Sequence, residues 1–291
     1  MKPKISLVYN ATIRNNGTPV YLNHGFQEAG YEVERFDPLG TAIPERPMLI
    51  RIDDGRDDLE YDLPHPHAYY AIDTHLGFEY RLKQAKKADM VWCAQLSGVN
   101  RMIENGVLAR WLPLACSPLA HPTIAELEQR GTPRCPIWYD IAFVGHMQPA
   151  DTSGRLDLLD EVMRKVSRVW YEFGVFHEDM ARSYHQARLG LNHSIRGDLN
   201  MRFFELASIG VTQVCPEMEG LKRLGFRAGE HYLPYSSVDD IAGYVRSWPR
   251  TPYINRAPSI AHNALGMVRY GHTYKHRALQ MMSDLRERKL A

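Results

Sequence analysis

Short apolar runs alternate with amphipathic stretches along most of the chain, and this order predicts a parallel α/β fold. The first run, KISLVYN from Lys4 to Asn10, has the length and composition of a buried strand. A loop that contains a glycine, a helical pattern from Val20 to Ala29 and a second strand, YEVERFDP, follow it. A strand, loop, helix and strand over about 35 residues have the size of a βαβ module. Because such strands pair in parallel, we expect helices to cover both faces of the sheet.

The same alternation continues to the middle of the chain, breaks once and then restarts. MLIRIDD, AYYAIDTH, ADMVWCAQ and ARWLPLAC predict further strands of the first half. Between Ser117 and Ile137 the chain is rich in proline and holds one short polar helix, which is typical of a linker. After this segment, YDIAFVGHM, VWYEFGVF and RLGLNHS predict strands that are separated by helices.

We therefore predict two Rossmann-like domains, each with a parallel sheet. The N-terminal domain spans 1–118, and 119–137 is a linker. The C-terminal domain spans 138–272, and 273–291 forms a terminal helix that could pack across both domains. In open α/β sheets, ligands bind where the carboxyl ends of strands lead into helices, so a ligand site is expected at those edges.

Composition and charge narrow the function classes. The chain has 291 residues, of which 44% are hydrophobic and 24% charged, and a formal net charge of +1, as in a soluble globular protein. The small net charge argues against a protein built mainly to coat nucleic acid or a membrane, although it allows a local basic groove. No apolar run is long enough to span a bilayer, and the N-terminus predicts a strand instead of a signal peptide.

The cysteines and histidines predict neither a disulfide framework nor a metal site. Cys93, Cys116, Cys135 and Cys215 lie far apart with no CxxC spacing, which favours reduced thiols in a cytoplasmic protein. The 13 histidines include no HExxH motif. We interpret the acidic segment RIDDGRDDLEYDLPHPH as a solvated loop in preference to a metal site.

One helical stretch, within DLNMRFFELASIGVTQVCPEMEG from Asp198 to Gly220, carries a charged pair among apolar side chains. Arg202 and Glu205 lie three residues apart in a segment whose other residues predict burial on nearly all sides. Gly210 ends this helix, and a short buried strand follows. Buried charges are unfavourable unless they are paired or bound to a ligand. The two side chains therefore either pair with each other or meet a ligand near the start of a core helix.

Loops that follow strands in the second half supply further polar groups. Gly145 and His146 follow the strand that begins near Tyr139, and a polar loop precedes the charged helix. Backbone N–H groups at helix starts, with arginine and histidine side chains, can hold a diphosphate, and a carboxylate one turn into the helix can accept hydrogen bonds from ribose hydroxyls. Single glycines and histidines at such places are also common as turns or satisfied polar groups. The candidate donor-binding residues are Gly145, His146, His193, Arg196, Asn200, Arg202 and Glu205.

From about Tyr139 to the end, the order of parts resembles the CgeB-like (spore-maturation protein) group of GT-B glycosyltransferases. MARSYHQA leads to the strand LGLN, and MRFFELASIG is similar to the family's Arg-x-Phe-Glu helix. The segments GLKRLGFRAGEHYLPY and RYGHTYKHRALQM follow in the family's order. The first half matches more loosely, in its fold pattern and in AYYAIDTHLG and ADMVWCAQ.

The resemblance implies a GT-B fold, in which the parallel sheets of two Rossmann-like domains face a central cleft. The C-terminal domain would hold most of a nucleotide sugar, and the N-terminal domain would bind the acceptor. Glu205 would bind the ribose, and Arg202 would be a phosphate or helix-positioning partner. The resemblance also implies no obligatory metal and no cofactor, since helix N-termini and basic side chains neutralise the leaving diphosphate.

One position departs from the pattern of many related GT-B enzymes, which carry two glutamates eight positions apart. Here Gly197 stands eight residues before Glu205, and Asp198 is the nearest carboxylate. We expect either that Asp198 contacts the donor sugar or that the sugar is bound differently.

The first half offers candidates for acceptor chemistry. AIDTH places Asp73 and His75 at the end of a predicted strand. Asp73 could deprotonate an acceptor hydroxyl in an inverting reaction, or it could cap the following helix. The loop from Asn10 to Thr18, with Arg14 and Gly17, could close over a substrate. The candidate catalytic residues are Asp73, His75 and Asp198.

The combined prediction is a cytoplasmic, metal-independent glycosyltransferase, a hexosyl- or pentosyltransferase, with a nucleoside-diphosphate sugar as donor and a UDP-sugar as the expected case. Two alternatives stay open: a catalytically lapsed nucleotide-sugar-binding or accessory protein, and a sugar epimerase of GT-B type. The chain has no GxGxxG after its first strand, which argues against an NAD-dependent dehydrogenase. The acceptor (protein, glycan, small molecule or modified nucleic-acid base), the stereochemical outcome and the oligomeric state are left open.

Overall fold

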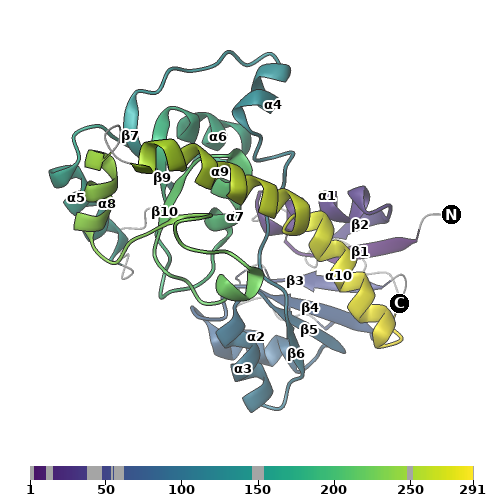
Figure 1. Cartoon of the computed structure of the whole chain (residues 1–291). Helices are drawn as coiled ribbons and strands as arrows, with labels where there is room; N and C mark the ends of the chain where they lie inside the picture. Colours follow the sequence, from purple (N-terminus) through teal and green to yellow (C-terminus); the bar gives the residue numbers. More distant parts are fainter. Residues whose placement is uncertain are drawn as a thin grey trace. The chain divides into compact units, whose positions relative to one another are not determined.

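A computed structural model divides the chain into two compact units, and their segments are coloured along the sequence in Figure 1. Unit 1 combines Met1–Leu114 with Thr273–Ala291, and unit 2 is the continuous segment Ala115–His272. The structure describes residues 3–10, 16–37, 48–53, 55, 62–145, 154–247 and 252–290, with the side chains of 252–257 left out.

Unit 1 contains a parallel six-stranded sheet in the order β2-β1-β3-β4-β5-β6. Its strands are β1 (Lys4–Val8), β2 (Glu32–Phe36), β3 (Leu49–Ile52), β4 (His67–Ala71), β5 (Met90–Cys93) and β6 (Ala109–Trp111). Its helices are α1 (Thr18–Glu28), α2 (Phe78–Ala85), α3 (Leu96–Glu104) and α10 (Tyr274–Glu287). β3, β4 and β5 are buried along their whole length, as expected for strands covered on both faces.

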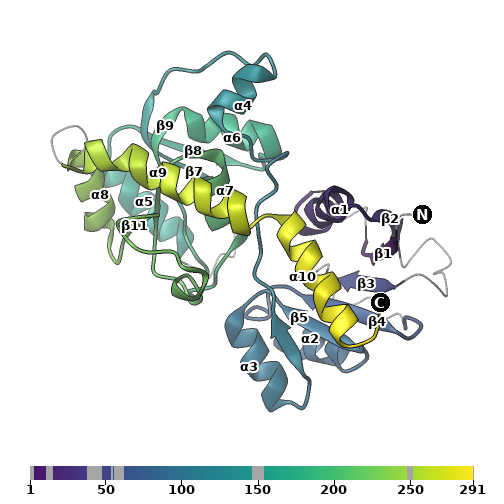
Figure 2. The same ribbon diagram turned by 45° about the vertical axis from the view of Figure 1, so that its right-hand side comes forward.

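The terminal helix α10 completes unit 1 by packing against α1, which both views of the chain show (Figures 1 and 2). The two backbones approach so closely that a Cβ at Gly25 would lie 2.5 Å from main-chain atoms of Tyr274. Arg277 donates hydrogen bonds to the carbonyl oxygens of Pro113 (2.7 Å) and Leu114 (3.3 Å). The segment expected as a terminal helix is therefore a structural part of unit 1.

Unit 2 contains a parallel five-stranded sheet in the order β11-β10-β9-β7-β8. Its strands are β7 (Tyr139–Gly145), β8 (Val169–Phe173), β9 (Ala187–Leu191), β10 (Gln213–Cys215) and β11 (Leu233–Pro234). Its helices are α4 (Ile124–Gln129), α5 (Arg155–Lys165), α6 (His177–His185), α7 (Met201–Ile209), α8 (Val238–Ser247) and α9 (Pro252–Gly271), with a 3₁₀ turn at Lys222–Leu224.

The first strand of unit 2, β7, shows how the sequence builds the core of this unit. Ile141 and Phe143 face a cluster formed with α5 and α8, whereas Ala142 and Val144 face a second cluster formed with α4, α6 and α7. Successive side chains of a strand point to opposite faces, so an uninterrupted apolar run supplies both faces at once. The prediction of two Rossmann-like units with parallel sheets is confirmed.

The segment 119–137, which we expected as a linker, lies within unit 2 and contributes α4 to it. Thr123 and Glu126 form a capping box at the start of α4, and Leu127 is completely buried. Arg269 of α9 donates to the carboxylate of Glu126 at 2.9 Å and 3.2 Å. These contacts tie the proline-rich segment to the body of the unit. In the described part of the chain, no helix combines the length and apolarity needed to cross a membrane.

Candidate donor-binding site

The strand order of unit 2 creates a topological switch point between the carboxyl ends of β7 and β9. The chain passes from β7 to β8 on one side and returns to β9 on the other side of β7. In open α/β sheets, nucleotides bind in the crevice at such a point. The loop after β7, residues 146–153, lies outside the described residues, and the predicted ligand His146 lies there too. The described part of the crevice is the β9–α7 loop, residues 192–200.

Gly145 is the last residue of β7, at the edge of this crevice. A Cβ at this position would lie 2.7 Å from two ring atoms of Phe143. Any larger residue here would therefore displace that ring, which gives a structural reason for the glycine. A contact between Gly145 and a ligand stays a prediction.

Two residues of the β9–α7 loop have a left-handed backbone conformation. Arg196 has φ 54° and Gly197 has φ 75°, and the side chain of Arg196 is exposed. The hydroxyl of Ser194 lies 2.7 Å from the carbonyl oxygen and 3.0 Å from the carboxylate of Asp198. The backbone N–H of Glu219, in the segment after β10, donates to the carbonyl of Gly197 at 3.3 Å. Asp198 is thus built into the turn, and its contact with a donor sugar stays a prediction.

The start of α7 is fixed by a network of amides. Asn200 is the N-cap, and its Oδ1 accepts from the backbone N–H of Phe203 at 3.2 Å. The side chains of Asn200 and Asn192 exchange two hydrogen bonds of 2.9 Å and 3.1 Å. His193 Nδ1 lies 3.2 Å from the hydroxyl of Tyr235. The predicted donor-binding residues Asn200 and His193 therefore belong to the framework of the crevice.

Arg202 and Glu205 form an ion pair inside the first two turns of α7. Arg202 Nη1 lies 3.0 Å from Glu205 Oε2, and the two side chains are 19% and 5% exposed. The guanidinium of Arg202 also packs against α6, where it lies 5.8 Å from the ring centre of Tyr184 and contacts the sulfur of Met180. The structure thus contains the ion pair between Arg202 and Glu205 that the sequence allowed as the alternative to ligand binding. Ribose binding by Glu205 stays a prediction.

A histidine that the sequence did not suggest faces the other oxygen of this carboxylate. His121 is completely buried, and its Nε2 lies 3.3 Å from Glu205 Oε1. The backbone N–H of Ser117 donates to Nδ1 of the same ring at 3.3 Å. In a neutral imidazole, this contact places the proton on Nε2, which faces Glu205. The carbonyl of His121 accepts from Ser208 (3.0 Å) and Arg269 (3.1 Å), so the ring is held from α7 and α9.

The environment keeps Glu205 ionised although it is buried. Burial alone raises the pKa of a carboxyl group, but the positive charge of Arg202, followed by His121 and His177, outweighs it and lowers the pKa of Glu205 to about 2. At neutral pH the side chain is therefore an anion that only accepts hydrogen bonds.

In unit 1, Asp73 and His75 follow β4 at the carboxyl edge of the sheet, and both are half-buried. Asp73 has φ 55°, and its carbonyl accepts from the N–H of Leu76 at 2.9 Å. The alternative that Asp73 caps the following helix is wrong, because α2 begins after Gly77, and this turn lies between them. Of the loop that could close over a substrate, residues 11–15, including Arg14, lie outside the described residues.

A buried ion pair next to the turn after β4 was not predicted. Asp53 follows β3 and pairs with Arg81 of α2, and the side chains are 1% and 7% exposed. Asp53 also accepts from the backbone N–H groups of Ile72 (3.0 Å) and Gly55 (2.8 Å). The available signal was an aspartate directly after an apolar strand. The pair holds the ends of β3 and β4 and helix α2 together.

Among the described residues, one group of three side chains has suitable atoms for a metal ion, namely His65, His67 and Asp89, with ligand atoms within 4.8 Å of one another. Lys86 and Lys87 line the same cavity and oppose a cation, so we assign no metal role to the group. The interpretation as a solvated loop is wrong for His67, which begins β4 and is 4% exposed. The His-Pro-His spacing was the signal that the sequence offered for this group.

Comparison with known proteins supports the likeness of the second half to glycosyltransferases, but not the narrower CgeB-like group. Residues 145–283 match the family model described as "Glycosyl transferase-like", a match over just under half of the chain. The matched segment includes the β9–α7 loop and the ion pair of α7. No curated protein matches the chain.

Solved structures resemble the chain over nearly its whole length. Sucrose-phosphate synthase from Thermosynechococcus elongatus has a TM-score of 0.65 at 13% identity, with 98% of this chain and 99% of that chain covered. Anabaena Alr3699/HepE in complex with UDP and glucose has a TM-score of 0.65 at 11% identity, with 98% and 100% covered. An α-glucosyltransferase in complex with UDP and a 13-mer DNA that contains a HMU base has a TM-score of 0.67 at 9% identity, with 98% and 99% covered. The chain therefore has the GT-B fold, as predicted.

Proposed function

We propose that the chain is a glycosyltransferase of the CgeB-like group that transfers a hexosyl or pentosyl group from a UDP-sugar to an acceptor hydroxyl in the cytoplasm. One observation carries this proposal: a buried, ionised carboxylate, Glu205, lies behind the loop at the switch point, inside the segment that matches the glycosyl transferase-like model. HepE and the α-glucosyltransferase have the same fold and are described in complex with UDP, which supports uracil as the base of the donor nucleotide.

In this proposal, Glu205 recognises the ribose. An ionised carboxylate has about four acceptor positions, two on each oxygen. Arg202 and His121 each face one oxygen, at 3.0 Å and 3.3 Å, so each oxygen keeps one position for a hydroxyl group. Two vicinal hydroxyls of a ribose match this pair of positions. Because the pKa of Glu205 is about 2, the acceptor is fully ionised at neutral pH.

The diphosphate would lie at the N-terminus of α7, close to the exposed side chain of Arg196. Free N–H groups and the helix dipole favour an anion at a helix start, and an arginine adds charge-assisted hydrogen bonds. These groups would stabilise the negative charge that develops on the leaving diphosphate. We therefore propose that transfer does not require a metal ion.

On the acceptor side, Asp73 or His75 would take the proton of the attacking hydroxyl. The bond between the anomeric carbon and the diphosphate breaks, the acceptor oxygen forms the new glycosidic bond, and UDP leaves. A base in this role needs a position near the hydroxyl and a suitable pKa. Both residues lie at the carboxyl edge of the sheet of unit 1, where ligands bind in such sheets.

Calorimetric titration with UDP, uridine and GDP tests the donor site. We expect UDP to bind more tightly than GDP. Arg196→Ala should weaken the binding of UDP about tenfold and leave the binding of uridine unchanged, since the arginine would contact only the phosphates. Glu205→Gln should weaken both UDP and uridine by about tenfold or more. Arg164→Ala and Glu161→Gln, on the exposed face of α5, are the matched controls.

The same variants separate the alternatives. If no nucleoside diphosphate binds, or if both site variants bind as the wild type does, the proposal is refuted. An accessory protein would bind UDP but release none from UDP-sugars in the presence of an acceptor panel. An epimerase would convert the sugar without any acceptor. Release of UDP that continues in excess EDTA would support transfer without a metal ion.

A further inference from the structure

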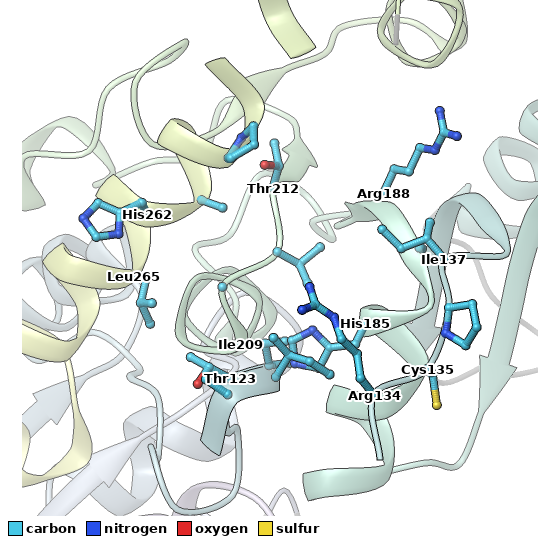
Figure 3. Close-up of a pocket in the computed structure, with 18 residues that line it drawn as sticks. Thr123, Arg134, Cys135, Ile137, His185, Arg188, Ile209, Thr212, His262 and Leu265 are labelled. Carbon is cyan, nitrogen blue, oxygen red and sulfur yellow. The ribbon is translucent and has the colours of Figure 1, made fainter. Parts of the chain in front are cut away.

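A second site lies in unit 2, at the opposite edge of the sheet from the switch point. A cavity of about 780 Å³ opens there, and Figure 3 shows the side chains around it. Its walls include Ala187 at the amino end of β9, Thr212 just before β10, and Ile209 and Gly210 at the end of α7. β9 has five residues, so about 15 Å of strand separates this cavity from the β9–α7 loop.

The cavity has the size and the lining of a small-molecule site. Pockets for such ligands have volumes of roughly 300–1,000 Å³ and apolar walls with a few polar groups. Ile137, Ile209, Val211 and Leu265 give this cavity apolar walls, and Thr123 and Thr212 add hydroxyl groups.

Apart from the thiol of Cys135, the ionisable side chains around the cavity are all basic in type. Arg134, Arg188, His185 and His262 line it, and its described lining includes neither aspartate nor glutamate. In Figure 3, the side chain of Arg134 reaches into the hollow beside His185. Burial, with a smaller effect of Arg134, lowers the pKa of His185 to about 4, so this ring is neutral at pH 7 and the arginines carry the charge.

The carboxylate that pairs with Arg188 is shared with another arginine. Asp140 lies 3.8 Å from Arg188 Nε but accepts two shorter hydrogen bonds, of 2.6 Å and 3.1 Å, from Arg168. For Arg134, the described residues show neither an ion pair nor a hydrogen bond. The cavity therefore combines apolar walls with a guanidinium that a ligand anion can reach.

We propose that this cavity binds an organic anion with an apolar body, that is, a carboxylate, sulfonate or phosphate on a hydrophobic group. Arg134 binds the anionic group, Arg188 contributes to the positive potential, and the aliphatic walls cover the body. The site is separate from the donor site, and it does not depend on the proposed glycosyl transfer.

Fluorescence titration with 1-anilinonaphthalene-8-sulfonate, together with its uncharged analogue N-phenyl-1-naphthylamine, tests this assignment. The sulfonate should bind with a stoichiometry of one. Arg134→Gln should weaken it about tenfold or more and leave the uncharged analogue unchanged. Ala125→Trp, from an exposed position in the lining, should weaken both probes by filling the cavity. Arg164→Gln, an exposed arginine of α5 outside the lining, is the matched control.

Circular dichroism and UDP titration of each variant show whether unit 2 is intact, which keeps this test distinct from that of the donor site. Octanoate and 1-naphthoate, which carry a flexible and a planar body, should compete with the sulfonate and show which body fits better. Binding of the sulfonate that does not saturate, or that is equal in the wild type and Arg134→Gln, would overturn the proposal.

Discussion

Two buried carboxylates, one in each unit, lie close to the carboxyl ends of a parallel sheet but differ in their partners. Asp53 of unit 1 pairs with Arg81 and also accepts hydrogen bonds from the backbone of Ile72 and Gly55. Among the described residues, Glu205 of unit 2 has side-chain partners, Arg202 and His121, and a further electrostatic effect of His177. The pKa changes are opposite: burial raises the pKa of Asp53 above its ordinary value, whereas the pKa of Glu205 falls to about 2.

Under the proposed function, the difference separates a carboxylate that belongs to the fold from one that binds a ligand. The backbone partners of Asp53 join two strand ends, so its hydrogen bonds are needed whenever unit 1 is folded. The partners of Glu205 orient it and keep it charged, yet they leave acceptor positions on both oxygens. We therefore expect substitution of Asp53 to affect stability most, and substitution of Glu205 to affect nucleotide binding most.

The largest effect should follow Asp53→Ala. Removing one partner of a buried pair leaves Arg81 as an uncompensated charge, which typically costs about 3–5 kcal/mol. Urea unfolding followed by fluorescence should show this loss. Asp62→Ala is the control, because Asp62 is 87% exposed in its pair with Lys87, and such exposed pairs contribute little to stability. A loss below about 1 kcal/mol for Asp53→Ala would contradict its structural role.

The pH dependence of stability should distinguish the two carboxylates. Because the pKa of Glu205 lies below its ordinary value of 4.5, its stabilisation is complete above pH 4.5 and is lost as the pH falls toward about 2. The stability difference between wild type and Glu205→Gln should therefore shrink by roughly 3 kcal/mol over this window.

For Asp53 the sign is reversed. Its raised pKa means that the folded state binds the proton more tightly, so acid should not remove a stabilising contribution of Asp53. Urea unfolding of Glu205→Gln, Asp53→Asn and the wild type at several pH values between 6 and about 2 measures both trends. Parallel curves for the two variants would remove the distinction between the carboxylates.

A smaller effect is expected from Asn200→Ala. The change removes the N-cap of α7 and both hydrogen bonds to Asn192, and it should lower the free energy of unfolding by about 1–2 kcal/mol. Thr123→Ala, which removes the cap of α4, gives a reference of about 1 kcal/mol. If Asn200→Ala weakens the binding of UDP without changing the free energy of unfolding, Asn200 is a ligand-binding residue and not part of the framework of the crevice.

The smallest change in stability should follow Arg196→Ala. This side chain is exposed on the β9–α7 loop, and substitutions at exposed positions usually change stability by less than about 0.5 kcal/mol. Thermal unfolding checks this expectation with and without UDP. The stabilisation by UDP should be smaller in the variant, since at a given ligand concentration a ligand that binds the folded state more weakly stabilises it less.

Local periodicity was sufficient to predict much of the fold, because alternating strands and helices leave a strong pattern of apolar residues. The burial of α7 and the contact between Arg202 and Glu205 also follow from spacing, since residues three apart are neighbours on a helix. His121 could not be predicted as a partner of Glu205. It lies in a proline-rich segment that resembles a linker, and only the packing of α7 and α9 around that segment brings the ring to the carboxylate.

The same reason applies to Asp53 and Arg81, which are 28 residues apart and meet only after β3, β4 and α2 have assembled. Of the candidate catalytic residues, Asp73 and His75 were correctly placed after a strand, but the turn before α2 was not predicted. A positive φ at an aspartate has no sequence pattern of its own, because it depends on how the neighbouring elements hold the backbone.

The division of unit 1 into two chain segments has a consequence for the order of folding during synthesis. Ala115–His272 emerges from the ribosome as one continuous stretch and can form its sheet without waiting for later residues. The sheet of unit 1 is made earlier, but α10 follows only after all of unit 2, and until then the carbonyl of Pro113 lacks its bond from Arg277 and the face of α1 at Gly25 lacks its neighbour. Unit 1 is therefore synthesised first but completed last. The surface of α1 that α10 covers stays uncovered during the whole synthesis of unit 2.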